Sequence, residues 1–264
     1  MKIPKHSPGS VLFALLSWTA AASAAAPPEE ATLYVKAGVL KPVRLFLPPD
    51  RDPRRPEILV VALHGRGGSI HDMARLWELF KAPRFILAVA EAPYPLAGGW
   101  SWDFPSRDRR LWEIADPLIP EYILSVIESV KRQYPVASVY LLGHSQGVSY
   151  AYLTGLLNPA IIRGLACFAG FYPGEFLPAE KVRTAAERMR FFIAHGRGDA
   201  AVDIAASKRA RDILENLGAT VNLFIFSGGH ALTEEALREA QKWIEADPQG
   251  KASLLEARKG VERR

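Results

Sequence analysis

The sequence predicts an α/β fold in which helices flank a doubly wound, mostly parallel sheet. The first observation is that short apolar runs alternate with longer amphipathic segments along the chain. The second is that these runs are apolar at consecutive positions, as expected for parallel strands buried on both faces. The third is the composition of the 264 residues, 49% hydrophobic and 23% charged, which excludes a mainly disordered protein.

The expected strands follow from these apolar runs. Residues 32–36 and 43–47 read as an opening pair, and a proline-rich loop follows them. Six further runs form the buried part of the sheet, at residues 58–63, 85–90, 139–142, 164–168, 191–194 and 221–226.

The expected helices carry apolar residues at roughly 3.6-residue spacing between the strands. They lie at residues 70–80, 119–133, 146–157, 178–188, 204–217 and 233–245. Ser69 with Asp72 resembles a capping box, Asp203 is placed to cap a helix, and Gly218 is placed to end one. No linker interrupts the series, so we expect one domain over residues 27–248. Ligands in such sheets bind beyond the carboxyl ends of the strands.

The first 24 residues have the pattern of an export signal. Lys2 and Lys5 precede a short apolar run, and Ala22-Ser23-Ala24 provides a small-residue cleavage site. The run is short for a membrane span. We therefore expect residues 1–24 to be cleaved and the mature protein to be periplasmic or extracellular, without stable membrane insertion; a retained N-terminal anchor helix is the alternative.

Charge and cysteine content exclude several other classes. The formal net charge of +5 falls to +3 without the signal, whose two lysines face no acid. Residues 249–264 are basic and are expected to form a flexible, solvated tail. No basic stripe interleaved with aromatic residues indicates nucleic-acid binding. The single cysteine, Cys167, excludes an intramolecular disulfide, a cysteine-rich zinc site and an iron–sulfur cluster, and is expected to be a small buried hydrophobe.

A nucleophile candidate lies between an expected strand and an expected helix. Gly143-His-Ser145-Gln-Gly147 has the Gly-x-Ser-x-Gly pattern, in which the serine occupies a tight strand-to-helix turn. The small flanking residues let the helix approach the strand, and the helix N-terminus favours negative charge. The alternative for Ser145 is a turn serine that only caps the helix.

A base and an acid follow two later strands. A serine hydroxyl needs a base to take its proton and a carboxylate to orient that base. Asp199 follows the strand at 191–194, and His230 follows the strand at 221–226, so the chain order is Ser145, Asp199, His230. Asp203 is the rival acid but fits helix capping better. The other histidines lie in the signal, in a helix, in the serine turn or before strand-end glycines: His6, His71, His144, His64 and His195.

Acyl transfer also requires donors for the developing oxyanion. One donor is expected to be the amide of Gln146. The second is expected in the glycine-rich loop at residues 64–68, where the amide of Arg66 is favoured and that of Gly67 comes next. A plain glycine turn is the alternative for this loop.

Together these motifs resemble the α/β-hydrolase superfamily. They are His64-Gly65-Arg66-Gly67-Gly68, Gly143-His-Ser-Gln-Gly147, His195-Gly-Arg-Gly-Asp199 and Gly228-Gly229-His230. More narrowly, they look like its small carboxylesterase/phospholipase branch, related to acyl-protein thioesterases and dienelactone hydrolases. The resemblance implies a carboxylic-ester hydrolase that works through a covalent acyl-enzyme, with no metal and no organic cofactor. The export signal, Arg66 and a long aromatic segment depart from that pattern.

The aromatic segment follows the strand at 85–90 and is therefore expected on the active-site side. Trp100, Trp102 and Phe104, with Trp112, are candidates for the walls of a substrate pocket, and packing of the loop onto the domain is the alternative. The neighbouring arginines either receive an acidic substrate group or form a solvated cluster. They are Arg107, Arg109 and Arg110.

Substrate size follows from the segment after the expected strand at 164–168. Residues 169–190 leave room for one helix, so we expect no large lid and an open cleft for small-molecule or surface-presented esters, with a short-chain or aromatic acyl group. A peptidase of the same fold and a non-catalytic binding protein are the alternative functions. The oligomeric state is left open.

Overall fold

The computed structural model describes residues 29–36, 40–107, 115–174 and 177–247. The expected signal peptide and the basic tail lie outside these residues, and so do Arg109, Arg110 and Trp112. No described helix has the length and apolar character needed to cross a bilayer.

In the described part of the chain, eight strands form one sheet in the order β1-β2-β4-β3-β7-β8-β9-β10. Strands β1 and β2 are antiparallel to each other, β2 is antiparallel to β4, and all other neighbours are parallel. The strands are β1 Glu29–Lys36, β2 Leu40–Leu47, β3 Glu57–Leu63, β4 Phe85–Ala90, β7 Val136–His144, β8 Gly164–Phe168, β9 Arg190–Gly196 and β10 Thr220–Phe226. The predicted fold class is therefore confirmed.

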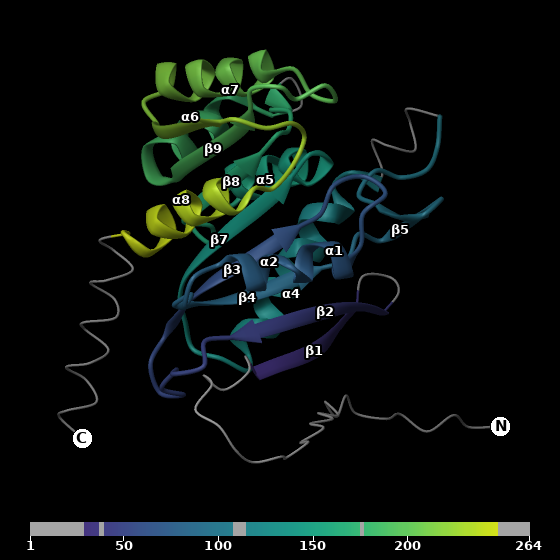
Figure 1. The fold of residues 1–264 in the computed structure, drawn as a ribbon, viewed down its shortest axis with the longest axis vertical. Coiled ribbons are helices and arrows are strands. Elements are labelled where there is room, and N and C mark those ends of the chain that lie inside the picture. Colours follow the sequence, from purple (N-terminus) through teal and green to yellow (C-terminus); the bar gives the residue numbers. More distant parts are fainter. Residues whose placement is uncertain (1–28, 37–39, 108–114, 175–176, 248–264) are drawn as a thin grey trace.

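Helices cover both faces of this sheet (Figure 1). One face packs against α4 Leu118–Lys131, α5 Gln146–Leu157, α6 Ala179–Arg188 and α7 Ile204–Asn216; the other packs against α1 Ile70–Ala74, α2 Leu76–Leu79 and α8 Glu234–Glu245. Alternate residues of β3 enter the two cores, Leu59 and Val61 on one side and Val60 and Ala62 on the other. Burial on both faces explains why the central strands are apolar at every position.

Two local features differ from the sequence prediction. The helix expected at 70–80 is divided into two short helices, with α1 ending before Arg75 and α2 ending before Phe80. Met73, Trp77 and Phe80 all pack into one apolar core. The hairpin formed by β5 Tyr94–Leu96 and β6 Gly99–Ser101 was not predicted. Its turn contains Gly98 at φ 84°, a left-handed conformation that favours glycine.

The predicted helix ends are confirmed. The side chain of Ser69 accepts from the amide of Asp72, and that of Asp203 accepts from the amide of Ala205 at 2.7 Å. Gly218 has φ 92° directly after the last turn of α7. Between β8 and β9 the described residues form only α6, so no large lid covers this edge of the sheet. Cys167 is buried, as expected.

Candidate active site

Ser145 occupies a strained turn between β7 and α5. Its backbone has φ 53° and ψ −118°, in the region that L-residues rarely adopt. A Cβ on Gly143 would lie 2.7 Å from the carbonyl of Gly147, and a Cβ on Gly147 would overlap the carbonyl of Leu63. Both positions therefore require glycine because the helix, the turn and β3 approach one another closely. This is the geometry of a nucleophile elbow.

Asp199 and His230 come together in the loops after β9 and β10. Nδ1 of His230 donates to Oδ2 of Asp199 at 2.8 Å, and the Asp199 side chain is fully buried. The other oxygen accepts from the amides of Ala201 and Val202 at 2.8 and 2.9 Å. Burial alone raises the pKa of Asp199, but these hydrogen bonds outweigh it and the pKa lies below its ordinary value. Asp199 is thus an ionised carboxylate that orients the His230 ring.

The two loops that carry these side chains are held together by their main chains. The amide of Gly198 donates to the carbonyl of Gly228 at 2.8 Å, and that of Arg197 donates to Phe226 at 2.9 Å. A Cβ on Gly196 would stand 2.6 Å from the Gly228 carbonyl, so the contact requires a residue without a side chain. Asp203, the rival acid, instead caps α7.

His230 packs against the residue that precedes Ser145. The rings of His144 and His230 have centroids 4.9 Å apart, whereas no hydrogen bond between Ser145 Oγ and His230 occurs in the described residues. Burial, reinforced by the neighbouring His230, lowers the pKa of His144 to about 4. The Nε2 of His144 is buried and has no hydrogen-bond partner within the described chain. His144 is therefore a neutral ring that supports His230 beside the elbow.

The three amides predicted as oxyanion donors differ in whether they already have a hydrogen-bond acceptor. The amide of Gly67 donates to the carbonyl of Trp100 at 2.8 Å, so the structure removes this amide from the candidate oxyanion donors. The amide of Arg66 has no acceptor among the described residues. Gln146 is the first residue of α5, where an amide has no intrahelical acceptor. Arg66 and Gln146 are thus the two candidates that the hydrogen bonding leaves available.

The comparisons with known proteins agree with this arrangement. Residues 51–247 match the family model described as Phospholipase/Carboxylesterase. The chain belongs to this family. Family members of this kind are hydrolases, and the predicted resemblance to the small carboxylesterase branch is confirmed.

Relatives of this carboxylesterase-family chain share its fold more clearly than its sequence. A protein of Oryza sativa subsp. japonica named as a probable carboxylesterase is 27% identical over 109 residues, which cover 41% of this chain and 46% of that protein. The carboxylesterase from Mesorhizobium loti has a TM-score of 0.66 at 22% identity and covers 83% of this chain and 99% of its own. A ferulic acid esterase from Anaeromyces mucronatus has a TM-score of 0.65 at 17% identity, covering 84% and 92%.

In the aromatic segment of this carboxylesterase-family protein, Trp102 packs beneath the site and does not line it. Trp102 has no exposed surface, so the prediction that it contacts substrate is wrong. Its Nε1 donates to the carbonyl of His64 at 2.8 Å, and its amide donates to Oε1 of Gln146 at 3.0 Å. Trp102 therefore joins the glycine-rich loop to the start of α5. A buried indole in the core with its N–H satisfied is the usual packing of tryptophan.

Trp100 and Phe104 are half-buried and have packing partners of their own. The Nζ of Lys41 lies 3.2 Å from the centre of the Trp100 ring, and Phe104 makes an edge contact with Tyr94. Lys41 also approaches the buried Glu91 at 3.9 Å. The assignment of Trp100 and Phe104 as substrate contacts stays a prediction.

Sequence reasoning missed an aromatic residue on the other side of Ser145. Phe171 is 52% exposed and follows β8 by three residues, and Ser149 of α5 donates to its carbonyl at 3.3 Å. A Cβ on Gly170 would stand 2.6 Å from the carbonyl of Ser145, so this loop lies against the elbow. An aromatic residue directly after a strand-end Ala-Gly pair was the only signal available.

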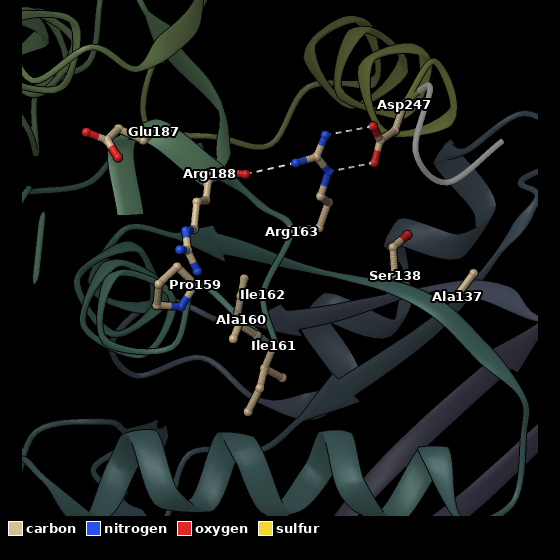
Figure 2. A pocket seen from close by; sticks show the side chains of 10 residues that line it. All are labelled: Ala137, Ser138, Pro159, Ala160, Ile161, Ile162, Arg163, Glu187, Arg188 and Asp247. Atoms are coloured by element: carbon tan, nitrogen blue, oxygen red, sulfur yellow. Dashed lines mark hydrogen bonds and ion pairs between the residues drawn. The ribbon is translucent and has the colours of Figure 1, made fainter. Parts of the chain in front are cut away.

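A cavity lies away from this site (Figure 2). Its volume is about 650 Å³, and its lining comes from the amino end of β7, the segment between α5 and β8, the end of α6, and Asp247. Figure 2 shows Arg163 facing Asp247, with hydrogen bonds of 3.0 and 3.2 Å between them. Substrates of this fold bind at the carboxyl ends of the strands, so this cavity is not the catalytic cleft. Among the described residues no cluster of three or more His, Cys, Asp or Glu suits a metal ion.

Proposed function

We propose that this protein is an exported serine hydrolase that cleaves carboxylic esters through Ser145, His230 and Asp199. The observation that carries the proposal is the 2.8 Å hydrogen bond from His230 to the buried Asp199, formed beside the strained elbow of Ser145. A carboxylate that holds Nδ1 leaves Nε2 of the same ring as the base for a serine hydroxyl. Family membership supports the hydrolase class.

The chemistry would run in two halves. Nε2 of His230 takes the proton of Ser145 Oγ while that oxygen attacks the ester carbonyl, and Asp199 stabilises the resulting imidazolium. The amides of Gln146 and Arg66 stabilise the tetrahedral oxyanion. The alcohol leaves with the proton from Nε2 and an acyl-enzyme forms. Water then gives a proton to Nε2, attacks the acyl carbonyl and releases the acid, and the proton returns to Ser145.

The test begins with the nucleophile. The mature protein is incubated with a fluorophosphonate probe, and the labelled residue is located by mass spectrometry. We expect labelling on Ser145 and loss of both labelling and ester turnover in Ser145→Ala. Folded protein that is neither labelled nor active would instead support the non-catalytic binding protein. Matched ester and amide substrates, offered to the same preparation, separate the esterase from the peptidase.

The proposed substrates are short-chain or aromatic esters, because the described residues place only α6 between β8 and β9, where a large lid would be inserted. In a series of chromogenic esters, we expect kcat/KM to fall as the acyl chain lengthens. A sharp rise in rate at a lipid interface would contradict this assignment.

Export rests on the pattern of the first 24 residues. We expect protein recovered from outside the cytoplasm to begin at Ala25, which N-terminal sequencing measures directly. Recovery of the intact chain in the membrane fraction would instead support the retained anchor.

A further inference from the structure

His64 is buried immediately after β3, and both of its ring nitrogens are engaged. Its Nε2 accepts a 3.0 Å hydrogen bond from the amide of Ala92. Because an amide N–H can only donate, Nε2 carries no proton and the neutral ring holds its proton on Nδ1. That Nδ1 lies 2.7 Å from the carbonyl oxygen of Gly65, which can only accept. The two neighbours therefore select a single tautomer of His64.

The surroundings keep this ring neutral. Burial lowers the pKa of His64, and the hydrogen bond to Gly65 opposes that effect without overcoming it. A proton on Nε2 would also face the N–H of Ala92. The donor on Nδ1 is therefore present near neutral pH on an uncharged ring.

The bond to Gly65 has a direct effect on the next residue. The Gly65 carbonyl and the Arg66 amide belong to one planar, trans peptide group, so the C=O and the N–H point in opposite directions. Two donors hold the carbonyl, Nδ1 of His64 at 2.7 Å and the amide of Gly68 at 3.0 Å. Holding the carbonyl in this way fixes the direction of the Arg66 N–H.

The same peptide group lies against the nucleophile. A Cβ on Gly65 would stand 3.2 Å from the Cβ of Ser145 and 3.3 Å from Nδ1 of His144. The peptide is therefore close enough to the elbow for its free N–H to serve a tetrahedral intermediate formed on Ser145.

We propose that His64 is a positioning residue that aims the Arg66 amide at the oxyanion, an inference that rests on the proposed function. His64 does not touch the substrate and acts through the peptide group it holds. Losing an oxyanion donor costs about a hundred- to a thousandfold in rate. A donor that is retained but no longer held in one direction should cost less, about 10- to 100-fold in kcat.

Two substitutions separate the two nitrogens of the ring. His64→Gln places a polar atom where Nε2 stood, so it keeps the acceptor for Ala92 and loses the donor to Gly65. His64→Asn places its amide where Nδ1 stood, so it keeps the donor and loses the bond to Ala92. We expect H64Q to lower kcat on a short ester by about 10- to 100-fold with KM within about threefold, and H64N to stay within about threefold of wild type.

Two further measurements extend the comparison. An alkylboronic acid forms a tetrahedral anion on an active serine, so its affinity should weaken in H64Q in proportion to kcat. Gly68→Ala leaves His64 unchanged, but its Cβ would stand 3.0 Å from the Gly65 carbonyl and 3.1 Å from Nδ1 of His64. It should disturb the same peptide and reproduce the loss in kcat. Thermal midpoints of H64Q and H64N should be similar, since each loses one hydrogen bond.

Equal losses of kcat in H64Q and H64N, or wild-type kcat in H64Q, would overturn the proposal. If either His64 variant fails to fold, Gly68→Ala decides, and wild-type kcat in that variant would overturn it. Failure of the proposed function has a different signature, because wild-type protein would then show neither ester turnover nor labelling of Ser145.

Discussion

At the scale of single residues, His144 couples the site to the pH dependence of stability. Its pKa is lowered to about 4 in the folded protein, against 6.5 for an unperturbed histidine. Between these values the unfolded state binds more protons than the folded state, so stability falls as the pH falls. At pH 5 the loss from this one group is roughly 2 kcal/mol relative to pH 7.

His144→Phe tests this coupling. The variant has no titrating group at this position, and it removes a buried Nε2 that lacks a partner among the described residues. We expect the drop in unfolding free energy between pH 7 and pH 5 to shrink by about 2 kcal/mol, as measured by urea denaturation. A variant that loses as much stability as wild type over this interval would show that His144 titrates normally.

Phe171 is the exposed aromatic side chain beside the elbow, and its effect should fall on substrate preference. Phe171→Ala should lower kcat/KM for an aromatic acyl ester by about tenfold, because a lost apolar contact costs about 1–2 kcal/mol. Turnover of an acetyl ester should change little. Leu157→Ala is the matched comparison, since Leu157 is an exposed apolar side chain at the opposite end of α5 from the elbow. Equal effects on both esters would argue against contact between Phe171 and the acyl group.

At the scale of elements, two aspartates in one loop have separate tasks. Asp203 caps α7 through the amide of Ala205, whereas Asp199 holds His230. Asp203→Ala should lower the unfolding free energy by about 1 kcal/mol and leave kcat unchanged. Asp199→Ala should lower kcat by about 10⁴-fold. Ester turnover and urea denaturation of the two variants test this. A large loss of kcat in Asp203→Ala would indicate that Asp203 is the carboxylate that orients His230.

At the scale of the whole molecule, Asp247 joins the ends of several elements. Its buried carboxylate accepts from Tyr140 of β7 at 2.7 Å and from Arg163 before β8 at 3.0 Å, and it lies 3.8 Å from Arg190 of β9. Burial by itself raises the pKa of Asp247, but the hydrogen bonds from Arg163 and Tyr140 outweigh it and the pKa is lowered. Its stabilisation is therefore present above the ordinary carboxyl pKa near 3.8 and is lost as the pH falls through the lower folded value.

Asp247→Ala should destabilise the protein by about 3 kcal/mol, because it removes the carboxylate that pairs with the guanidinium groups of Arg163 and Arg190 and accepts from the buried phenol of Tyr140. The arginines keep some solvent access, which places the cost at the lower end for broken buried pairs. Asp247→Asn keeps an acceptor for Tyr140 and should lose less. Urea midpoints for the two variants measure the difference. An unchanged midpoint in Asp247→Ala would show that the contacts of Asp247 do not stabilise the fold.

The sequence predicted those parts of the fold and site that depend on local pattern and on topology. Consecutive apolar residues indicated the buried strands, and the rule that parallel strands end at one edge indicated that Asp199 and His230 would meet. The role of Trp102 could not be read in this way. Its partner is the carbonyl of His64, 38 residues earlier in the chain, and an indole that supports a loop has the same sequence pattern as one that walls a pocket.

The same limit applies to Gly67 and Phe171. Neighbouring glycine-loop amides are equivalent in sequence, and only the pairing of the loop with the hairpin shows that the Gly67 amide is engaged by Trp100. Phe171 carries no motif, and its position follows from the contact of Gly170 with the elbow.

Residues 99–104 are attached to both sides of the nucleophile, and this determines which positions suit mutagenesis for altered ester selectivity. Trp102 contacts the loop after β3 through its side chain and the start of α5 through its amide. A mutant library directed at residues 99–104 would therefore return mostly slow catalysts rather than altered selectivity. The Phe171 side chain is 52% exposed, and the printed contacts of its loop with the elbow run through Gly170 and the Phe171 carbonyl, so diversity introduced at position 171 alone should change which esters are accepted while turnover is preserved.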